Sequence, residues 1–331
     1  ATALAGAGFG AICGSSTAAA ATLSSTSLPA MLKYNYDRPV AAGVVAISGT
    51  LSMLIPPSVA MIVYGLLADV NLAKMLIAGV IPGIMVTLTI TLTVYLWALR
   101  YPDHAPLTDR ITLREKLALL RLVGPMLILM MAVTGVIYTG IATPTEASAV
   151  GALAAAVLYF LRGKRSFRDV FEVVTRATKT SCMIGVIILG AHIFTTFFAL
   201  SQTTQVIIAW VGGLEVAPWV ILASLVLVIL VLGCFMDQMA ILVLTVPVVA
   251  PLLHSMGFDL IWFGVIMIIT AEIGLVTPPM GLNCFVVAKY SRVPVASVFR
   301  GVAPHVVAHL IVLTIFLLFP ALSLWLPNQM Q

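Results

Sequence analysis

The sequence MLIPPSVAM occupies residues 53–61, and LVTPPMGLN occupies residues 275–283. Each places two adjacent prolines inside an apolar run. Proline has no backbone N–H to donate, and its ring clashes with the carbonyl four residues earlier, so a helix that reaches Pro56 or Pro278 must break. In lipid, a broken backbone must face protein or a polar cavity, because hydrocarbon offers no hydrogen-bonding partner. The meaning of both stretches therefore depends on whether the chain lies in a membrane.

The composition of the chain is that of a membrane protein. It is 61% hydrophobic and 9% charged, whereas soluble domains are roughly 45–50% apolar and about 25% charged. Apolar runs close to the length of a membrane span recur at 124–142, 180–200, 217–235 and 302–326. The two proline pairs are therefore predicted to interrupt helices inside a lipid bilayer.

The net charge of +5 does not indicate nucleic-acid binding. The basic residues are concentrated from Arg100 to Arg121 and from Arg162 to Lys179, which is typical of cytoplasmic loops. The four cysteines lack metal-ligand spacing, so neither a disulfide framework nor a zinc site is predicted. The chain begins ATALAGAGFG, without a methionine, and we expect a truncated N-terminus.

An internal repeat relates the two halves of the chain at an offset of 222 residues. This offset aligns Pro29 with Pro251, Asp37 with Asp259, Pro56-Pro57 with Pro278-Pro279, Gly79 with Gly301, and Pro82 with Pro304. Interrupted hydrophobic segments at corresponding positions of two halves are a sequence signature of secondary transporters.

The repeat predicts the same elements in each half. An apolar arm, a small or polar tip (GSST at 14–17, GCFMD at 233–237) and a second arm predict a re-entrant helical hairpin, because each arm is short or interrupted. The first repeat, 1–99, is predicted to contain a hairpin at 1–33, a broken helix at 38–66 and a span at 72–99, and to lack its N-terminal part. Residues 100–179 supply connecting helices and cytoplasmic loops. The second repeat, 180–331, is predicted to contain a span at 180–200, a hairpin at 217–255, a broken helix at 260–288 and a final span at 295–326.

The charge distribution predicts opposite orientations for the two halves. If the basic loops are cytoplasmic, tracing the spans puts every Lys and Arg except Lys74 on the cytoplasmic side. The stretch 201–259 contains no Lys or Arg and is predicted to be periplasmic. The first hairpin then enters from the cytoplasm and the second from the periplasm, which makes the repeat inverted.

Five motifs in order resemble those of a known family. They are GFGAICGSSTAAAATLSSTSLPAM at 8–31, GTLSMLIPPSVAMIVYG at 49–65, GIATPTEASAVGAL at 140–153, GCFMDQMAILVLTVPVVAPL at 233–252 and EIGLVTPPMGLNCFVV at 272–287. Together with FPALSLWLP at 319–327, they resemble the large membrane subunit, of the DctM type, of tripartite ATP-independent periplasmic (TRAP) transporters. The resemblance covers the whole chain, but family members carry additional scaffold helices before its start.

The resemblance implies a fold, a function and partners. The implied fold is an all-α, polytopic transporter of the bacterial inner membrane, with inverted repeats, two re-entrant hairpins and two proline-broken helices, working as an elevator. The implied activity is sodium-coupled uptake of a small organic acid, such as a C4-dicarboxylate or a sugar acid. A soluble periplasmic binding protein would deliver the substrate, and a small four-helix membrane subunit would complete the complex. No cofactor other than the coupling ion Na⁺ is expected.

The residues themselves predict where ions and substrate bind. Each break frees carbonyl oxygens that suit sodium, and each restarting half-helix presents unpaired N–H groups at a positive dipole end. One sodium ion is predicted in each half. The candidate ligands are Gly14, Ser15 and Ser16 facing Gly49, Thr50 and Ser52, and Gly233 and Asp237 facing Gly274 and Thr277. No Arg or Lys is predicted at the membrane centre, so the candidates for an anionic substrate are Ser15, Thr17, Ser58, Met280 and Asn283.

Two acidic residues carry open alternatives. A carboxylate near the bilayer midplane costs roughly 2.5–3.5 kcal/mol on insertion scales, so Asp237 should have a partner. It is interpreted as a sodium ligand or a cap beside that site, with a periplasmic helix cap alone as the alternative. Glu272 corresponds to Thr50 in the repeat, and a structural hydrogen bond and a coupling role are weighed equally. Protons are the alternative coupling ion, with Asp237 or Glu272 as carrier.

Other interpretations find less support in the residues. His305 and His309 lie one helical turn apart, but no nearby carboxylate or Cys completes a metal site, so a polar helix face near the cytoplasm is expected. The serine-rich stretch 22–29 lacks a general base, and no catalytic cluster for an intramembrane enzyme is found. A sodium/carboxylate symporter of similar architecture without a binding protein remains an alternative, and an ion channel is the alternative from a different class.

Overall fold

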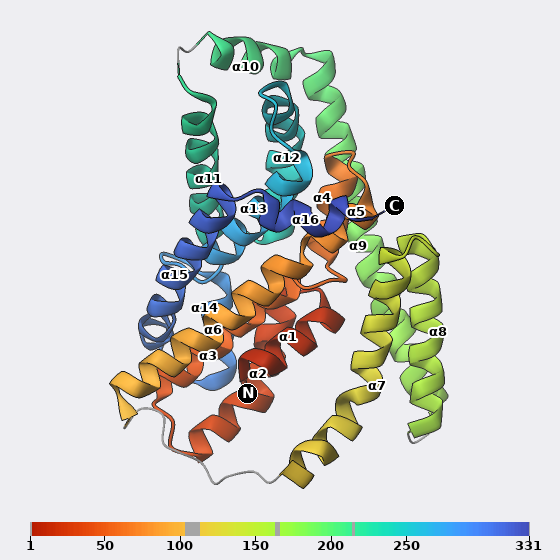
Figure 1. Ribbon diagram of the computed structural model, residues 1–331, viewed down its shortest axis with the longest axis vertical. Helices are drawn as coiled ribbons and strands as arrows, with labels where there is room; N and C mark the ends of the chain where they lie inside the picture. Colours follow the sequence, from red (N-terminus) through yellow and green to blue (C-terminus); the bar gives the residue numbers. More distant parts are fainter. Residues whose placement is uncertain (1, 103–112, 163–165, 214–215, 331) are drawn as a thin grey trace.

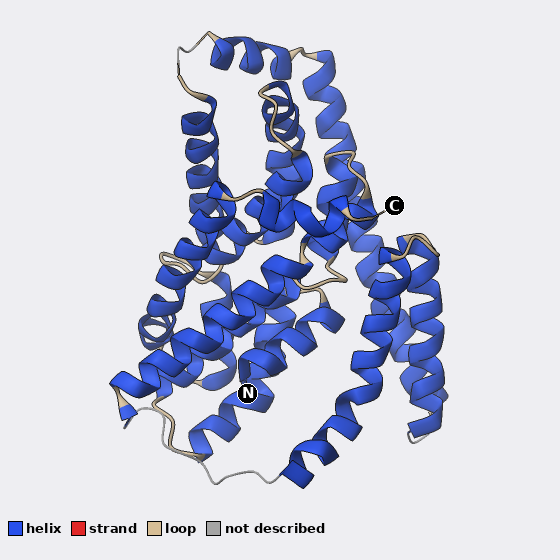
Figure 2. Ribbon diagram, viewed as in Figure 1, coloured by secondary structure: helices blue, strands red, loops and turns tan. Residues whose placement is uncertain are grey.

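The computed structural model describes residues 2–102, 113–162, 166–213 and 216–330, and these are built from helices and connecting turns without a β-strand (Figure 2). Parts of the two predicted cytoplasmic loops, residues 103–112 and 163–165, lie outside the described residues. The first half contains α1 (Thr2–Cys13), α2 (Ser16–Lys33), α3 (Arg38–Thr50), the 3₁₀ turn η1 (Leu51–Met53), α4 (Val59–Leu67), α5 (Leu72–Ala78) and α6 (Val80–Arg100).

The remaining helices follow in the order that the repeat predicts. Two connecting helices, α7 (Leu113–Tyr138) and α8 (Pro144–Arg162), pack against each other to one side of the molecule (Figure 1). The second half contains α9 (Phe167–Leu200), α10 (Thr203–Gly212), α11 (Pro218–Phe235), α12 (Gln238–Ser255), α13 (Leu260–Gly274), α14 (Leu282–Ser291), α15 (Val295–Leu318) and α16 (Ala321–Asn328).

Local sequence explains where the helices begin. At each hairpin tip a short polar residue caps the second arm: Ser15 accepts a hydrogen bond from the N–H of Ala18 at 3.5 Å, and Asp237 accepts one from the N–H of Met239 at 3.1 Å. The start of α8 has a reciprocal cap, because the Glu146 carboxylate accepts from the N–H of Thr143 while the Thr143 hydroxyl accepts from the N–H of Glu146.

Each proline pair interrupts a helix. The first helix stops at Thr50, continues as the 3₁₀ turn, and restarts as α4 after Pro56 and Pro57. The second stops at Gly274 and restarts as α14 at Leu282. In both pairs the bond between the two prolines is cis.

Four expectations about element bounds need correction. The stretch 162–179, expected as a loop, is helical from Phe167, because Ser166 caps α9 and the apolar residues that follow recur at helical spacing. The predicted span 72–99 is divided into α5 and α6 at Gly79. The final span ends at Leu318, and Pro320 starts α16. The arms α11 and α12 are full 18-residue helices, each long and apolar enough to cross a membrane.

The two broken helices form the centre of the molecule. Residues 40–50 of α3 and 262–274 of α13 are buried on every side, as expected for helices that are apolar all round. The arms α1 and α2 pack on α3, and α11 and α12 pack on α13. In contrast, α8 and α9 are almost entirely exposed. Among the described residues six helical segments have the length and composition of membrane spans: Leu72–Arg100, Pro144–Leu161, Phe167–Leu200, Pro218–Phe235, Gln238–Ser255 and Val295–Leu318.

A close helix crossing joins the two halves. Gly43 of α3 lies against Gly301 of α15, and a Cβ atom built on Gly301 would lie 1.8 Å from the carbonyl oxygen of Pro39. Only glycine allows the two backbones to approach this closely. The first broken helix is therefore held directly against the last long helix of the chain.

Candidate functional site

The candidate site is built from the two helix breaks and the hairpin arms packed on them. At the first break three hydroxyl groups donate to carbonyls that the interruption leaves without helical partners. Thr50 Oγ1 donates to Ile47 O at 2.8 Å, Ser52 Oγ donates to Gly49 O at 2.8 Å, and Ser58 Oγ donates to Met53 O. All three side chains are buried. Each hydroxyl oxygen keeps lone pairs after donating, so the first break presents oxygen atoms that a hard cation prefers.

The first hairpin contacts this break along its arms. A Cβ atom on Gly10 would lie 2.7 Å from Ser52 Cα, and one on Gly49 would lie 2.9 Å from the backbone nitrogen of Ala20. The tip residue Gly14, which turns the chain with φ +61°, has its nearest neighbours in Val59 at the start of α4. The predicted pairing of Gly14 with Gly49 is therefore corrected, because the tip extends past the 3₁₀ turn to the restarting half-helix.

The second hairpin meets its break as predicted. Gly233 and Gly274 are in contact, since a Cβ atom on Gly274 would lie 2.5 Å from Gly233 Cα. Across the break, the N–H of Gly281 donates to Cys234 O at 3.2 Å. The Thr277 hydroxyl donates to Ile273 O at 2.6 Å, as Thr50 does in the first half. Asp237 is half-buried and caps α12, so at least this part of its interpretation is present.

Each hairpin also packs against the half-helix of the other half. The arm α2, which begins at Ser16, contacts α14, and the arm α12, which begins at Gln238, contacts α4. Sequence reasoning paired each tip only with the break of its own half. The structure thus brings four short segments together: two hairpin arms and the N-terminal ends of two restarting helices, where backbone N–H groups favour anions.

Buried polar side chains without a protein partner gather on these segments. Both terminal atoms of Gln238, Glu272 and Asn283, and the Ser16 hydroxyl, have no hydrogen-bond partner among the described residues. All four side chains are at most 1% exposed. An unsatisfied buried polar group costs about 1–3 kcal/mol, so each of these groups calls for an explanation.

Sequence reasoning missed Gln238, although a signal for it was present. Gln238 follows Asp237 at the tip and corresponds to Ser16 at the repeat offset of 222 residues. It was overlooked because attention went to the charge of its neighbour. Ser48 of α3 was also missed; its hydroxyl has no partner within the described chain, and a Cβ atom on Gly6 of α1 would lie 2.7 Å from Ser48 Cβ.

The substrate candidates do not share one environment. Ser58 is buried and caps α4 by accepting from the N–H of Met61 at 3.3 Å. Asn283 is fully buried at the start of α14, whereas the Met280 side chain is 50% exposed. Thr17 is half-buried and its hydroxyl lies 3.3 Å from that of Ser15. The Met280 side chain is therefore the least suited of these candidates to an enclosed site.

The charges inside the described part of the protein are few. Its buried residues include Glu272 as the sole acidic side chain and contain no Lys or Arg. No group of three His, Cys, Asp or Glu with metal-binding geometry occurs within the described ranges. His305 and His309 are buried, 3% and 1% exposed, which corrects the expectation of a polar face. They are buried because α15 packs against both α3 and α13.

Comparison with known proteins agrees with this architecture. The family model of the tripartite ATP-independent periplasmic transporter, DctM component, matches residues 1–322. The C4-dicarboxylate TRAP transporter large permease protein DctM of Pseudomonas aeruginosa is 36% identical over 97% of this chain and 75% of its own length. The protein of the same name from Vibrio cholerae is 31% identical over 98% of the chain and 76% of its own length. The sialic acid TRAP transporter permease protein SiaT of Haemophilus influenzae is 29% identical over 97% of the chain and 52% of its own length.

The matches and the membrane-spanning helices lead to one conclusion. The six candidate spans, together with bacterial permeases as relatives, identify a multi-pass protein of the bacterial inner membrane that transports and is not an enzyme. The chain belongs to the DctM family, the large permease component of tripartite ATP-independent periplasmic transporters.

Proposed function

We propose that this chain couples the inward movement of sodium to the uptake of a small organic anion. The observation that carries the proposal is the set of buried, unpartnered polar groups of Ser16, Gln238, Glu272 and Asn283 on the segments that meet at the two breaks. A chain that pays desolvation of these groups without internal partners gains if a polar ligand or ion satisfies them in the working protein.

Sodium is the proposed coupling ion because both breaks present hard oxygen ligands. In the first half the ligands are drawn from Gly14, Ser15, Ser16, Gly49, Thr50 and Ser52. In the second half they are drawn from Gly233, Asp237, Gly274 and Thr277. The hydroxyl–carbonyl pairs at Thr50, Ser52 and Thr277 support this assignment, since each keeps free lone pairs at a helix end. Proton coupling through Asp237 or Glu272 is the competing mechanism that the experiment below separates.

The proposed substrate is an organic anion. The relatives are named as transporters of C4-dicarboxylates, sialic acid and isethionate, all of which are anions. Without a buried Lys or Arg in the described chain, the positive ends of α4 and α14, the amides of Gln238 and Asn283, and the bound sodium would balance the negative charge. Ser15, Thr17 and Ser58 are proposed to contribute hydroxyl or N–H groups, with the backbone near Met280.

The proposed movement is an elevator within an inverted repeat. The hairpins and broken helices would form the moving body, because α3 and α13 are buried among them. The connecting helices α7 and α8 and the long helix α9 would remain outside it, since α8 and α9 make little buried surface. A periplasmic binding protein and a small membrane subunit are the proposed partners, in keeping with a family described as tripartite.

Uptake by the reconstituted protein tests this proposal. Proteoliposomes that contain the permease complex are given labelled organic acid with or without the binding protein, and with an inward gradient of sodium or of choline. We expect uptake only with both sodium and binding protein. Unchanged uptake in choline would overturn sodium coupling, and uptake driven by a pH gradient would establish protons instead. Uptake without binding protein would indicate a symporter, and dissipative anion flow that no gradient concentrates would indicate a channel.

A further inference from the structure

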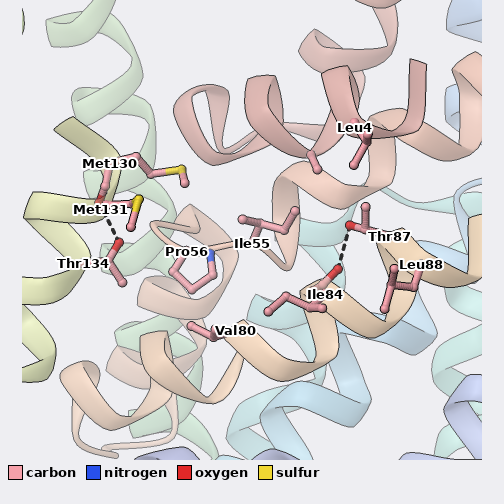
Figure 3. A pocket seen from close by; sticks show the side chains of 12 residues that line it. Leu4, Ile55, Pro56, Val80, Ile84, Thr87, Leu88, Met130, Met131 and Thr134 are labelled. Carbon is pink, nitrogen blue, oxygen red and sulfur yellow. Dashed lines mark hydrogen bonds between the residues drawn. The ribbon is translucent and has the colours of Figure 1, made fainter. Parts of the chain in front are cut away.

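A second, wholly apolar cavity lies away from the two breaks. It has a volume of about 410 Å³ and is bounded by α1, the start of the first break, α6 and α7 (Figure 3). Ile55 and Pro56 form one wall, Thr87 and Leu88 a second, and Met130 and Met131 a third. A volume of this size falls in the roughly 300–1,000 Å³ range of small-molecule sites.

The cavity offers nothing to the transported anion. Its two hydroxyl groups, on Thr87 and Thr134, already donate to the carbonyl oxygens of Gly83 at 2.7 Å and Met130 at 2.9 Å within their own helices (Figure 3). No charged side chain lines it. Apolar cavities of this kind stay dry and accept hydrocarbon.

The cavity opens on the surface that faces the bilayer. Leu4, Ile84, Leu88 and Met131, which line it, are each more than half exposed. On α6 the exposed apolar row continues from Leu88 to Leu99. Because the protein is a multi-pass membrane protein, this row contacts acyl chains, and the cavity is a recess in the same surface.

We propose that one acyl chain of a membrane phospholipid occupies this cavity. A lipid tail gains no hydrophobic energy by leaving other tails, but a filled recess regains the van der Waals contacts that a void forfeits. The flexible side chains of Met130 and Met131 adapt to a chain of variable shape. A helix from another subunit does not fit, since one helical turn about 10 Å wide and about 5.4 Å long already takes up roughly 420 Å³.

Native mass spectrometry of the intact transporter tests the proposal. The complex is purified from membranes in a mild detergent, washed extensively, and its retained phospholipid is identified. Leu88→Trp and Met131→Trp fill the cavity from opposite walls. Leu96→Trp is the matched control, because Leu96 is a similarly exposed leucine on α6 that does not line the cavity.

We expect the wild-type protein and the Leu96→Trp variant to retain one phospholipid, and both filling variants to lose it. Having two filling variants on different helices guards against a folding defect in either one, and size-exclusion chromatography checks each. Retention of the lipid by both folded filling variants would overturn the proposal. So would a wild-type protein that carries only detergent at the detergent concentration used, which would mean adventitious filling of the recess. These measurements do not involve uptake, so their failure is distinct from failure of the transport proposal.

Discussion

The two helix breaks occupy corresponding positions in the repeat but are furnished with different side chains. At the offset of 222 residues, Ser15 corresponds to Asp237, Ser16 to Gln238, and Thr50 to Glu272. At each of these positions the first half has a short hydroxyl group and the second half a longer carboxylate or amide. The cap positions show that the backbone role is shared, since Ser15 and Asp237 both cap the second arm of a hairpin.

The difference separates structural from functional demands. Hydroxyl groups at the first break are largely satisfied by nearby carbonyls, as at Thr50, Ser52 and Ser58. At the second break, Gln238, Glu272 and Asn283 have no such partners within the described residues. A helix break thus needs only short side chains to be stable, and the longer ones in the second half are the better candidates for ligand contacts.

The packing of the two halves also differs, and this predicts the largest effect. Only the first broken helix crosses a long helix at a glycine pair, Gly43 with Gly301, at a distance that leaves no room for a Cβ atom. We expect Gly301→Val to prevent correct folding. Overpacking a core costs about 1–3 kcal/mol, and here the obstacle is the backbone oxygen of Pro39, which a rotamer change cannot relieve.

Size-exclusion chromatography and thermal melting in detergent measure this effect. Gly190→Val is the matched control, because a Cβ atom on Gly190 of α9 would meet nothing within 4 Å. A Gly301→Val protein that elutes and melts like the wild type would show that the crossing is not a fixed contact between the halves.

The second prediction concerns the charge at the second hairpin tip. We expect Asp237→Ala to abolish sodium-dependent uptake while the protein remains inserted in the membrane. Asp237→Asn should be inactive as well, because asparagine keeps the helix cap but removes the negative charge. Ser15→Ala, at the corresponding cap, should lose about 1 kcal/mol of local stability and keep measurable uptake.

Uptake in proteoliposomes as a function of sodium concentration distinguishes the two roles of Asp237. Recovery of activity in Asp237→Asn alone would reduce the residue to a helix cap. Normal sodium dependence in Asp237→Ala would make it dispensable for both roles.

The third prediction compares the unpartnered residues that follow the two caps. Gln238→Ala should raise the sodium or substrate concentration for half-maximal uptake about tenfold, since one lost hydrogen bond to a buried ligand is worth about 1.5 kcal/mol. Ser16→Ala removes a single hydroxyl group and should have a smaller effect in the same direction. Concentration series for each variant, normalised to protein in the membrane, provide the measurement. Equal effects, or a larger one at Ser16, would contradict the assignment of ligand contacts chiefly to the second half.

Part of this arrangement could be predicted from the sequence because proline and glycine act locally. A proline pair interrupts a helix whatever surrounds it, so the breaks at Pro56 and Pro278 followed directly. The helix caps at Ser15 and Asp237 were predictable for the same reason. The contact of Gly233 with Gly274 followed from placing a hairpin tip against the break.

Other features depend on tertiary packing and were not predictable. The apolar residues of α13 surround the helix on all sides, so its pattern does not tell which helices pack on which face. The contacts of α2 with α14 and of α12 with α4, and the burial of His305, arise only when the halves come together. The helical start of α9 at Phe167 was missed because its basic residues were interpreted as a loop.

The last prediction tests the orientation of the halves and should leave uptake unchanged. Ser255 ends the second hairpin and Lys33 ends the first, and both side chains are exposed. The distribution of basic residues, with none between 201 and 259, predicts that Ser255 faces the periplasm and Lys33 the cytoplasm. Single cysteines at these positions, in a protein whose four native cysteines are replaced, are treated with a membrane-impermeant thiol reagent from outside. Ser255→Cys should be labelled in intact cells, and Lys33→Cys only after the membrane is opened. Labelling of both positions from the same side would show that the halves are not inverted. The comparison of Ser15, Ser16 and Thr50 with Asp237, Gln238 and Glu272 would then concern two unrelated breaks rather than two versions of one site.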